Sequence, residues 1–115
     1  HNYDDPNCVV YGTTHDSDTI KGYFDGKSDY QLAYLYEYMG IKAKEEISDA
    51  FIRLAYSSIA NVVILQMQDV LQLGNEARMN HPGTASENWK WRLWHNAIPE
   101  ERRSWIRTTA RIYRR

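Results

Sequence analysis

Two short apolar runs constrain the fold of this 115-residue chain more than any other feature. Both runs, Cys8–Tyr11 and Val62–Leu65, are rich in β-branched or aromatic residues, which favour strands. The apolar residues of Val62–Leu65 stand at successive positions, as expected for a strand that is covered on both faces in a parallel sheet. Cys8–Tyr11 is likewise predicted to be buried. Each run leads directly into a polar series, where we expect the strand to end in a loop.

Two helical patterns separate these predicted strands. Apolar residues recur at helical spacing within Leu32–Met39, and Gly40 is the expected C-cap. A second helix is predicted to begin at Ser48 as its N-cap, with Ile47 and Ile52 at the spacing of a hydrophobic staple. Two parallel strands joined by such a crossover form a right-handed unit of an α/β sheet.

The segment after the second strand is predicted to be mostly irregular. A brief helical turn over Val70–Leu73 ends at Gly74, and residues 75–94 contain Pro82 and Gly83. Pro99 suits the first position of a final helix. One stripe of that helix has packing capacity: Arg102, Trp105, Ile106, Thr109, Ala110 and Tyr113.

The predicted elements are too few for a complete α/β domain. Two strands expose unpaired edges, and the few helices cannot cover both faces of the pair. The composition is that of a globular protein, with 43% hydrophobic and 25% charged residues, so disorder does not explain the shortage of strands. We therefore interpret the chain as a slice of a larger fold, which could associate with itself through its open strand edges.

The charge is distributed unevenly along the chain. Residues 1–50 carry ten acids and four lysines, net −6, whereas residues 51–115 carry ten bases and five acids, net +5. Most of the positive excess lies in the final helix, behind Glu100 and Glu101, as expected for charges that complement a helix dipole. We favour this interpretation over nucleic-acid binding, because the whole chain has a net charge of −1 and lacks a recognised binding motif.

Several features bear on the cellular compartment. No apolar run approaches the roughly 20 residues that cross a bilayer, so we expect no membrane partner. Residues 1–5 lack the basic and apolar regions of a secretory signal. The single cysteine, Cys8, forms no internal disulfide. Together these features favour the cytoplasm, or the plastid stroma if the source is a plant.

The tetrad His15–Asp18 carries the most chemistry of any segment. Its imidazole and carboxylates suit a metal, but zinc sites recruit further His or Cys, and the other histidines show no ligand-like spacing, so we expect no metal or other cofactor. A Ser-His-Asp triad lacks the glycine-flanked elbow of its serine. Two interpretations stay open from spacing alone. Asp16 and Asp18 cap the turn toward Gly22, or the tetrad binds a carbohydrate or other polyol.

Three blocks of the sequence then carry a specific resemblance. Residues 9–19 resemble Tyr-Thr-Gly-Thr-His-Asp-Asn-Asp-Thr, residues 68–83 resemble a Gln-Asp to Ala-Arg-Met-Asn-x-Pro-Gly block, and residues 88–93 resemble Asn-Trp-x-Trp-Arg. All three belong, in this order, to the 4-alpha-glucanotransferases, also called amylomaltases or disproportionating enzymes. The chain departs from the pattern in the transposed pair Gly12–Thr13, in Ser17, which stands for Asn, and in Glu87, which stands where Gly is frequent.

The resemblance implies the C-terminal slice of a TIM (β/α)₈ barrel. Cys8–Tyr11 would be similar to the seventh strand and Val62–Met67 to the eighth. A complete barrel needs roughly 250 residues. Residues 1–115 would thus be the C-terminal part of a glycoside hydrolase-type catalytic domain, most of which precedes His1.

The resemblance also implies the chemistry. These enzymes cut an α-1,4 bond with retention, through a glycosyl-enzyme on one carboxylate while a second carboxylate acts as acid and base. Both of those carboxylates come from earlier strands. Asp16 is similar to a third carboxylate, which stabilises the oxocarbenium-like transition state, and His15 would donate to the same sugar. Asp18, Gln68 and Asn80 are expected to bind the maltooligosaccharide or other α-1,4-glucan.

The aromatic and basic residues near these blocks could have either structural or substrate-binding roles. For Trp89, Trp91 and Trp94 we favour packing of a loop onto a barrel over stacking on sugar. Arg78 and Arg92 are expected to form ion pairs or to hold loops, because the substrate is neutral.

Two classes of function remain from the sequence. In the first, the chain is part of a 4-alpha-glucanotransferase and is inactive when isolated from the rest of that enzyme. The second is a noncatalytic carbohydrate-binding or scaffolding module derived from that fold.

Overall fold

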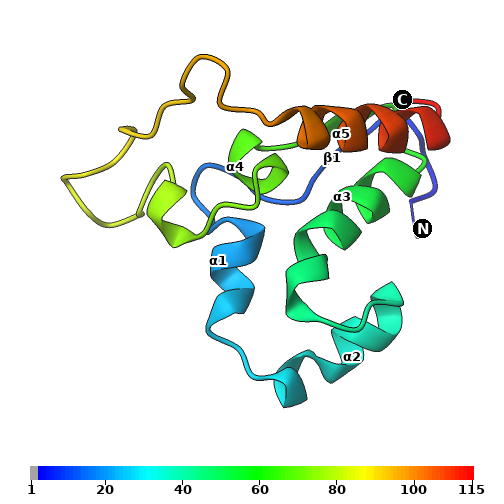
Figure 1. The fold of residues 1–115 in the computed structure, drawn as a ribbon, viewed down its shortest axis with the longest axis horizontal. Coiled ribbons are helices and arrows are strands. Elements are labelled where there is room, and N and C mark those ends of the chain that lie inside the picture. The colour runs from blue at the N-terminus through cyan, green and yellow to red at the C-terminus, as the bar shows by residue number, and fades with distance from the viewer. Residues whose placement is uncertain (1–2) are drawn as a thin grey trace.

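The architecture is an α/β arrangement of two strands and surrounding helices (Figure 1). The structure is a computed structural model that describes residues 3–115. In chain order the elements are β1 (Val9–Tyr11), α1 (Ile20–Asp25), α2 (Asp29–Met39), the 3₁₀ turn η1 (Lys44–Glu46), α3 (Ile47–Ser57), β2 (Val62–Ile64), α4 (Met67–Val70), the 3₁₀ turn η2 (Asn75–Ala77) and α5 (Glu100–Ile112).

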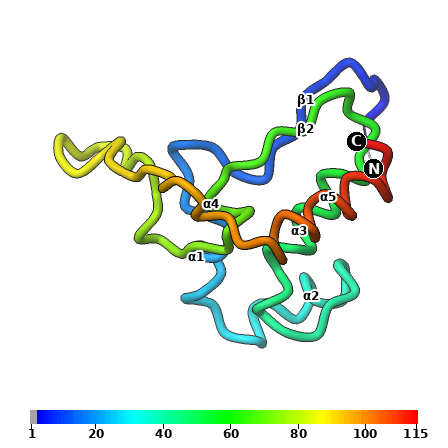
Figure 2. Tube along the Cα trace, turned by 45° about the horizontal axis from the view of Figure 1, so that its top comes forward, coloured from blue at the N-terminus to red at the C-terminus, as the bar shows by residue number. Residues whose placement is uncertain are grey.

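The two strands pair in parallel, as predicted. Val9 lies opposite Val62, and Tyr11 lies opposite Ile64. Figure 2 shows β1 and β2 running alongside one another, with the helices of the crossover to one side. The predicted α/β class is therefore confirmed. β2 is shorter than the predicted Val62–Met67, because Met67 already begins α4.

The prediction that both strands are buried is wrong for this chain. Val9 and Val62 are 43% and 46% exposed, and Tyr11 and Ile64 are about half exposed. The helices cover too little of a two-stranded sheet. The overall dimensions agree: the radius of gyration is 14.9 Å, against about 13 Å for a compact domain of this length. The exposed surface is 7957 Å², against about 6,500 Å² for a compact protein of this mass.

The core lies between α1, α2 and α3. Ile20, Leu32 and Ile47 are almost fully buried and form one apolar cluster. Partly buried residues surround it, including Phe24 of α1 and Phe51 of α3, whose ring centroids lie 5.6 Å apart. All three helices between β1 and β2 thus contribute a residue to the same small core.

The helix α2 agrees with its prediction, but the start of α3 does not. Gly40 ends α2 in the left-handed conformation (φ 66°), as expected for a C-cap. Ser48, the predicted N-cap of the next helix, is buried inside α3, and Ile47 is already helical, so the staple is absent. The chain enters α3 through η1, where Glu46 accepts hydrogen bonds from the backbone N–H groups of Lys42 and Ala43.

Helix α1 was not predicted, because Gly22 and Gly26 indicate turns. Its N-cap is Thr19, whose hydroxyl accepts from the Gly22 N–H. A Cβ atom at Gly22 would lie 2.4 Å from Asp18 Oδ1 and 2.7 Å from the Asn75 backbone nitrogen. Gly22 therefore permits close packing within a helix rather than a turn.

The region after β2 is largely irregular, as predicted. The expected helical turn over Val70–Leu73 lies earlier, in α4. Beyond η2, the chain extends away from the helices as a long arm, coloured yellow to orange in Figure 1. The arm ends at Pro99, which caps α5 from just outside instead of occupying its first position.

The last helix, α5, packs through its predicted stripe. Each stripe residue is at least partly shielded, and Thr109 is 1% exposed. Arg102 donates to both carboxylate oxygens of Asp49 in α3, at 2.7 and 3.1 Å, and to the Val70 carbonyl. The first turn of α5 is acidic and its last turn contains Arg111, which confirms the predicted charge arrangement.

Candidate functional site

The polar segments that follow β1 and β2 meet at one end of the strand pair. The backbone N–H of Asn80 donates to the His15 carbonyl at 3.1 Å, and the Asn80 amide donates to Asp16 Oδ1 at 2.7 Å. These residues are 64 or more positions apart in sequence. They meet because the carboxyl ends of parallel strands lie at the same edge of a sheet.

Arg78 links the same two segments through the backbone. Its Nε donates to the Asn80 carbonyl and its Nη2 donates to the Asp16 carbonyl, both at 2.8 Å. Arg92 donates to the carbonyls of Trp89 and Trp91. The loop-holding roles predicted for both arginines are confirmed.

Asp16 and His15 form the accessible part of the cluster. Their side chains are 53% and 55% exposed, and His15 Nε2 lies 3.4 Å from Asp16 Oδ1. Within residues 3–115, the other carboxylate oxygen of Asp16 accepts no hydrogen bond. A half-exposed carboxylate with one open oxygen, beside an imidazole, can accept a hydrogen bond from a hydroxyl group and stabilise nearby positive charge.

Trp89 packs against this cluster without entering a core. Its ring centroid lies 5.1 Å from that of His15, with the rings tilted by 35°. Its backbone N–H donates to the Met79 carbonyl at 2.6 Å. Trp89 is 50% exposed and Trp94 is 81% exposed, so core packing of these two indoles is not observed in this chain.

Asp18 is engaged within the chain on both oxygens. Oδ1 accepts from the Thr19 N–H and Oδ2 accepts from the Asn75 amide, each at 2.8 Å. The first bond lies at the start of α1 and the second reaches η2. These contacts agree with the structural interpretation, in which Asp18 caps a turn. Asp16, by contrast, bonds to Asn80.

Gln68 lies apart from the accessible cluster. It is 4% exposed, and its amide donates to the Ala77 carbonyl at 3.2 Å. Among the described residues, no hydrogen bond joins it to His15, Asp16 or Asn80. Its predicted contact with substrate stays a prediction.

Asp69 and Thr13 form a pair that the sequence did not predict. Asp69 is 2% exposed; its Oδ1 accepts from the Ile20 N–H at 2.7 Å, and its Oδ2 accepts from the Thr13 hydroxyl. Burial raises the pKa of the Asp69 carboxyl above its ordinary value, although both hydrogen bonds act in the opposite direction. The available signal was that each residue belongs to a polar series directly after a strand.

Residues 3–115 offer neither a metal cluster nor a membrane-spanning helix. They contain no group of three or more His, Cys, Asp or Glu side chains placed to hold a metal ion. None of their helices has the length and apolar character needed to cross a membrane.

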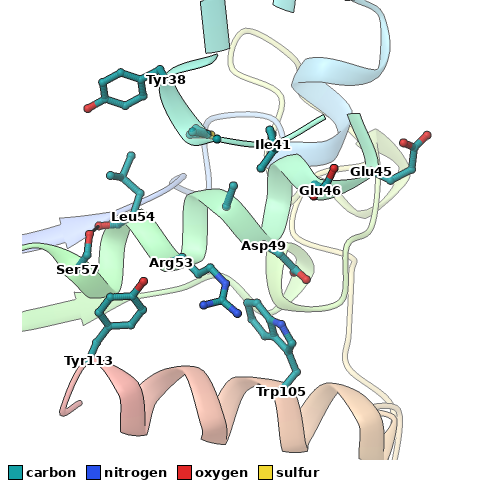
Figure 3. Close-up of a pocket in the computed structure, with 13 residues that line it drawn as sticks. Tyr38, Ile41, Glu45, Glu46, Asp49, Arg53, Leu54, Ser57, Trp105 and Tyr113 are labelled. Atoms are coloured by element: carbon teal, nitrogen blue, oxygen red, sulfur yellow. Dashed lines mark hydrogen bonds between the residues drawn. The ribbon is translucent and has the colours of Figure 1, made fainter. Parts of the chain in front are cut away.

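A separate cavity of about 650 Å³ lies between α2, α3 and α5. Figure 3 shows Arg53 of α3 and Trp105 of α5 pointing toward one another across it. The guanidinium carbons of Arg53 and Arg102 lie 5.6 and 4.3 Å from the Trp105 ring centroid. None of the predicted site residues lines this cavity, so the candidate site is the cluster around Asp16.

Comparisons with known proteins match most of the chain. A family model described as 4-alpha-glucanotransferase matches residues 1–96. The 4-alpha-glucanotransferase of Synechocystis sp. is 43% identical over 105 residues, which cover 91% of this chain and 20% of that relative. The chloroplastic/amyloplastic enzyme of Solanum tuberosum is 44% identical over 93 residues, covering 81% of this chain and 16% of that relative.

A solved structure matches the fold as well. The amylomaltase from Streptococcus agalactiae in complex with acarbose superposes with a TM-score of 0.89 at 34% identity, over 100% of this chain and 23% of that one. The chain thus spans about a fifth of the length of the relatives it matches, and its fold corresponds to part of the amylomaltase TIM barrel. Sequence blocks, strand pairing and superposition all lead to one assignment: the chain belongs to the 4-alpha-glucanotransferase family.

Proposed function

We propose that residues 1–115 are the C-terminal part of the barrel domain of a 4-alpha-glucanotransferase. The complete enzyme would transfer α-1,4-glucan segments between maltooligosaccharides, or to glucose, with retention. The single observation that carries the proposal within the chain is the half-exposed Asp16 carboxylate, held by Asn80 where two parallel strands end. Membership of the family supplies the reaction class.

In this proposal Asp16 stabilises the transition state. Its open oxygen accepts a hydrogen bond from a hydroxyl of the reacting sugar, and this hydrogen bond strengthens as positive charge develops on the ring. His15 donates to the same sugar, and Asn80 orients Asp16 and adds a polar contact. Asp18 and Gln68 contribute less directly, because both carboxylate oxygens of Asp18 and the amide nitrogen of Gln68 already bond within the chain.

The nucleophile and the acid/base carboxylate belong to the remainder of the enzyme. Neither role requires a metal or organic cofactor, since two carboxylates can supply nucleophile, acid and base. The cellular location proposed is the cytoplasm, or the plastid stroma in a plant, as the name of the Solanum tuberosum relative suggests for that protein.

The test compares Asp16→Asn with Asp25→Asn in the complete enzyme. Asp25 is an exposed partner of Lys21, so its substitution leaves turnover of maltotriose unchanged. Asp16→Asn removes charge that acts in the transition state and lowers kcat by about 10²–10³-fold. Unaffected turnover in Asp16→Asn would contradict the proposal.

The isolated 115-residue chain provides a second measurement. It is expected to release no glucose from maltotriose, because it lacks two of the three carboxylates. Robust turnover by the chain alone would contradict the assignment of a partial site.

The alternative is a noncatalytic carbohydrate-binding or scaffolding module derived from the same fold. This alternative predicts that maltoheptaose binds the isolated chain with heat measurable by calorimetry. It also predicts that the segment is not part of a longer enzyme.

A further inference from the structure

A buried carboxylate, Asp69, has no role in the site described so far. It lies in α4, directly after β2, and is 2% exposed. Removing a carboxylate from water is costly unless hydrogen bonds compensate it. The hydrogen-bond partners of Asp69 therefore have to offset the cost of burying its carboxylate.

Its two contacts lie at the two ends of one loop. Thr13 follows β1 and donates its hydroxyl to Asp69 Oδ2, while Ile20, the first residue of α1, donates its backbone N–H to Oδ1 at 2.7 Å. The Thr13 hydroxyl also accepts from the Gln66 amide at 2.8 Å. The loop between these contacts, residues 13–20, carries both His15 and Asp16. One carboxylate therefore sets where this loop begins and where it ends.

We propose that Asp69 is a positioning residue that acts through Asp16, by holding both ends of the 13–20 loop. This inference rests on the proposed role of Asp16 in the glucanotransferase reaction. Asp69 itself contacts no substrate. It determines where the Asp16 carboxylate stands relative to the sugar, and a displacement of about 1 Å can cost about 10²-fold in rate.

The donor and acceptor count explains why the residue is a carboxylate. Asp69 faces two donors, the Ile20 N–H and the Thr13 O–H, and offers one acceptor oxygen to each. An asparagine offers one acceptor and one donor group, so one of the two contacts would be lost or reoriented. Burial also disfavours the charged form of Asp69, which raises its pKa. Stability alone therefore does not account for a carboxylate here.

The experiment is a double-mutant cycle in the complete enzyme, with kcat and KM measured on maltotriose. Asp69→Asn is expected to lower kcat by about 10–100-fold, with KM changed by less than about twofold. In the Asp16→Asn background, Asp69→Asn is expected to lower kcat by less than about threefold further. Losses that multiply would indicate a general structural defect and overturn the inference, as would unchanged kcat in Asp69→Asn.

A second variant covers the case in which Asp69→Asn does not fold. Thr13→Val removes one of the two contacts and keeps the side-chain shape, so it should lower kcat about 10-fold and lose this effect in the Asp16→Asn background. Thr109→Val is its control, because the Thr109 hydroxyl is buried in α5 and has no hydrogen-bond partner in residues 3–115. Asp49→Asn controls for Asp69→Asn, because Asp49 is a partly buried carboxylate outside the loop. Both controls should leave kcat within about twofold.

The outcomes separate this inference from the proposed function. If Asp16→Asn leaves turnover unchanged, the proposed role of Asp16 fails, and the inference fails with it. If Asp16→Asn is strongly impaired while Asp69→Asn and Thr13→Val behave like their controls, only the inference fails.

Discussion

The loops at the carboxyl ends of β1 and β2 are held together within the chain, whereas the faces of the same strands are half exposed. Hydrogen bonds from Arg78 and Asn80 join the loops across more than 60 positions of sequence. By contrast, Val9, Val62 and Ile64 each leave more than 40% of their surface open. The described chain therefore contains the hydrogen-bond partners of its polar loops, but it does not contain the side chains that would cover the faces of its strands.

This difference separates two kinds of organisation. A hydrogen bond needs one donor and one acceptor at a defined distance, and two neighbouring strands suffice to provide both. Covering a strand needs layers of side chains on both faces and along both edges, which only a larger sheet supplies. A slice of a barrel can thus preassemble part of a site while its apolar surfaces stay open.

Among changes that distinguish the joined loops from the open strand faces, breaking the contact between the two loops is expected to have the largest effect. Arg78→Met removes both charge-assisted bonds, to the carbonyls of Asp16 and Asn80, and should lower kcat of the complete enzyme by about 10–100-fold. Arg92→Met is the matched control, because Arg92 bonds only carbonyls of its own segment. Equal losses in the two variants would mean that linkage between the loops is not what Arg78 contributes.

A smaller effect is expected where α1 packs against η2. Gly22→Ala places a methyl group 2.7 Å from the Asn75 backbone nitrogen, and should lower the free energy of unfolding by about 1–2 kcal/mol. Urea denaturation of the chain measures this change. Gly26→Ala is the control, since a Cβ there meets nothing within 4 Å. Equal stability of the two variants would contradict the close packing at Gly22.

The open strand faces predict self-association of the isolated chain. Replacing Val62 and Ile64 by Thr removes exposed apolar surface, and should weaken association by about 10-fold, as measured by sedimentation. Tyr34→Ser serves as control, because Tyr34 is 78% exposed but lies on α2. A chain that stays monomeric at all concentrations would show that the open strand faces drive no self-association.

The smallest effect concerns pH. Because burial raises the pKa of Asp69 above its ordinary value of 3.8, the folded state binds this proton more tightly than the unfolded state. The contribution of Asp69 to stability is therefore complete below about pH 4 and is lost as the pH rises through the raised pKa. The free energy of unfolding of the wild type, minus that of Asp69→Asn, should decrease between pH 4 and pH 7. A difference that grows over this range would contradict the direction of the shift.

Patterns repeated along the chain predicted the elements well. The strand pairing, α2 with its Gly40 cap and the stripe of α5 all agree with the structure, because each depends on periodicity or on a local backbone preference. The predicted burial of both strands was wrong because too few helices cover them, and two further predictions failed at single residues whose surroundings override a local rule. Ser48 has the chemistry of an N-cap, yet α3 begins one residue earlier, at Ile47, because the chain enters it directly from η1. Gly22 indicates a turn, yet it permits the close contact between α1 and Asn75.

The candidate site divides in the same way. His15 and Asp16 could be named from their chemistry and from their place after a strand, and Asn80 could be named from the resemblance. That Asp69 holds Thr13 and Ile20 and that Arg78 bridges two loops depend on groups that meet across about 50 or more positions. That Gln68 is buried likewise depends on packing and not on its residue type. Chemistry and periodicity are local properties of a sequence, whereas burial and partnership arise only when distant segments exclude water together.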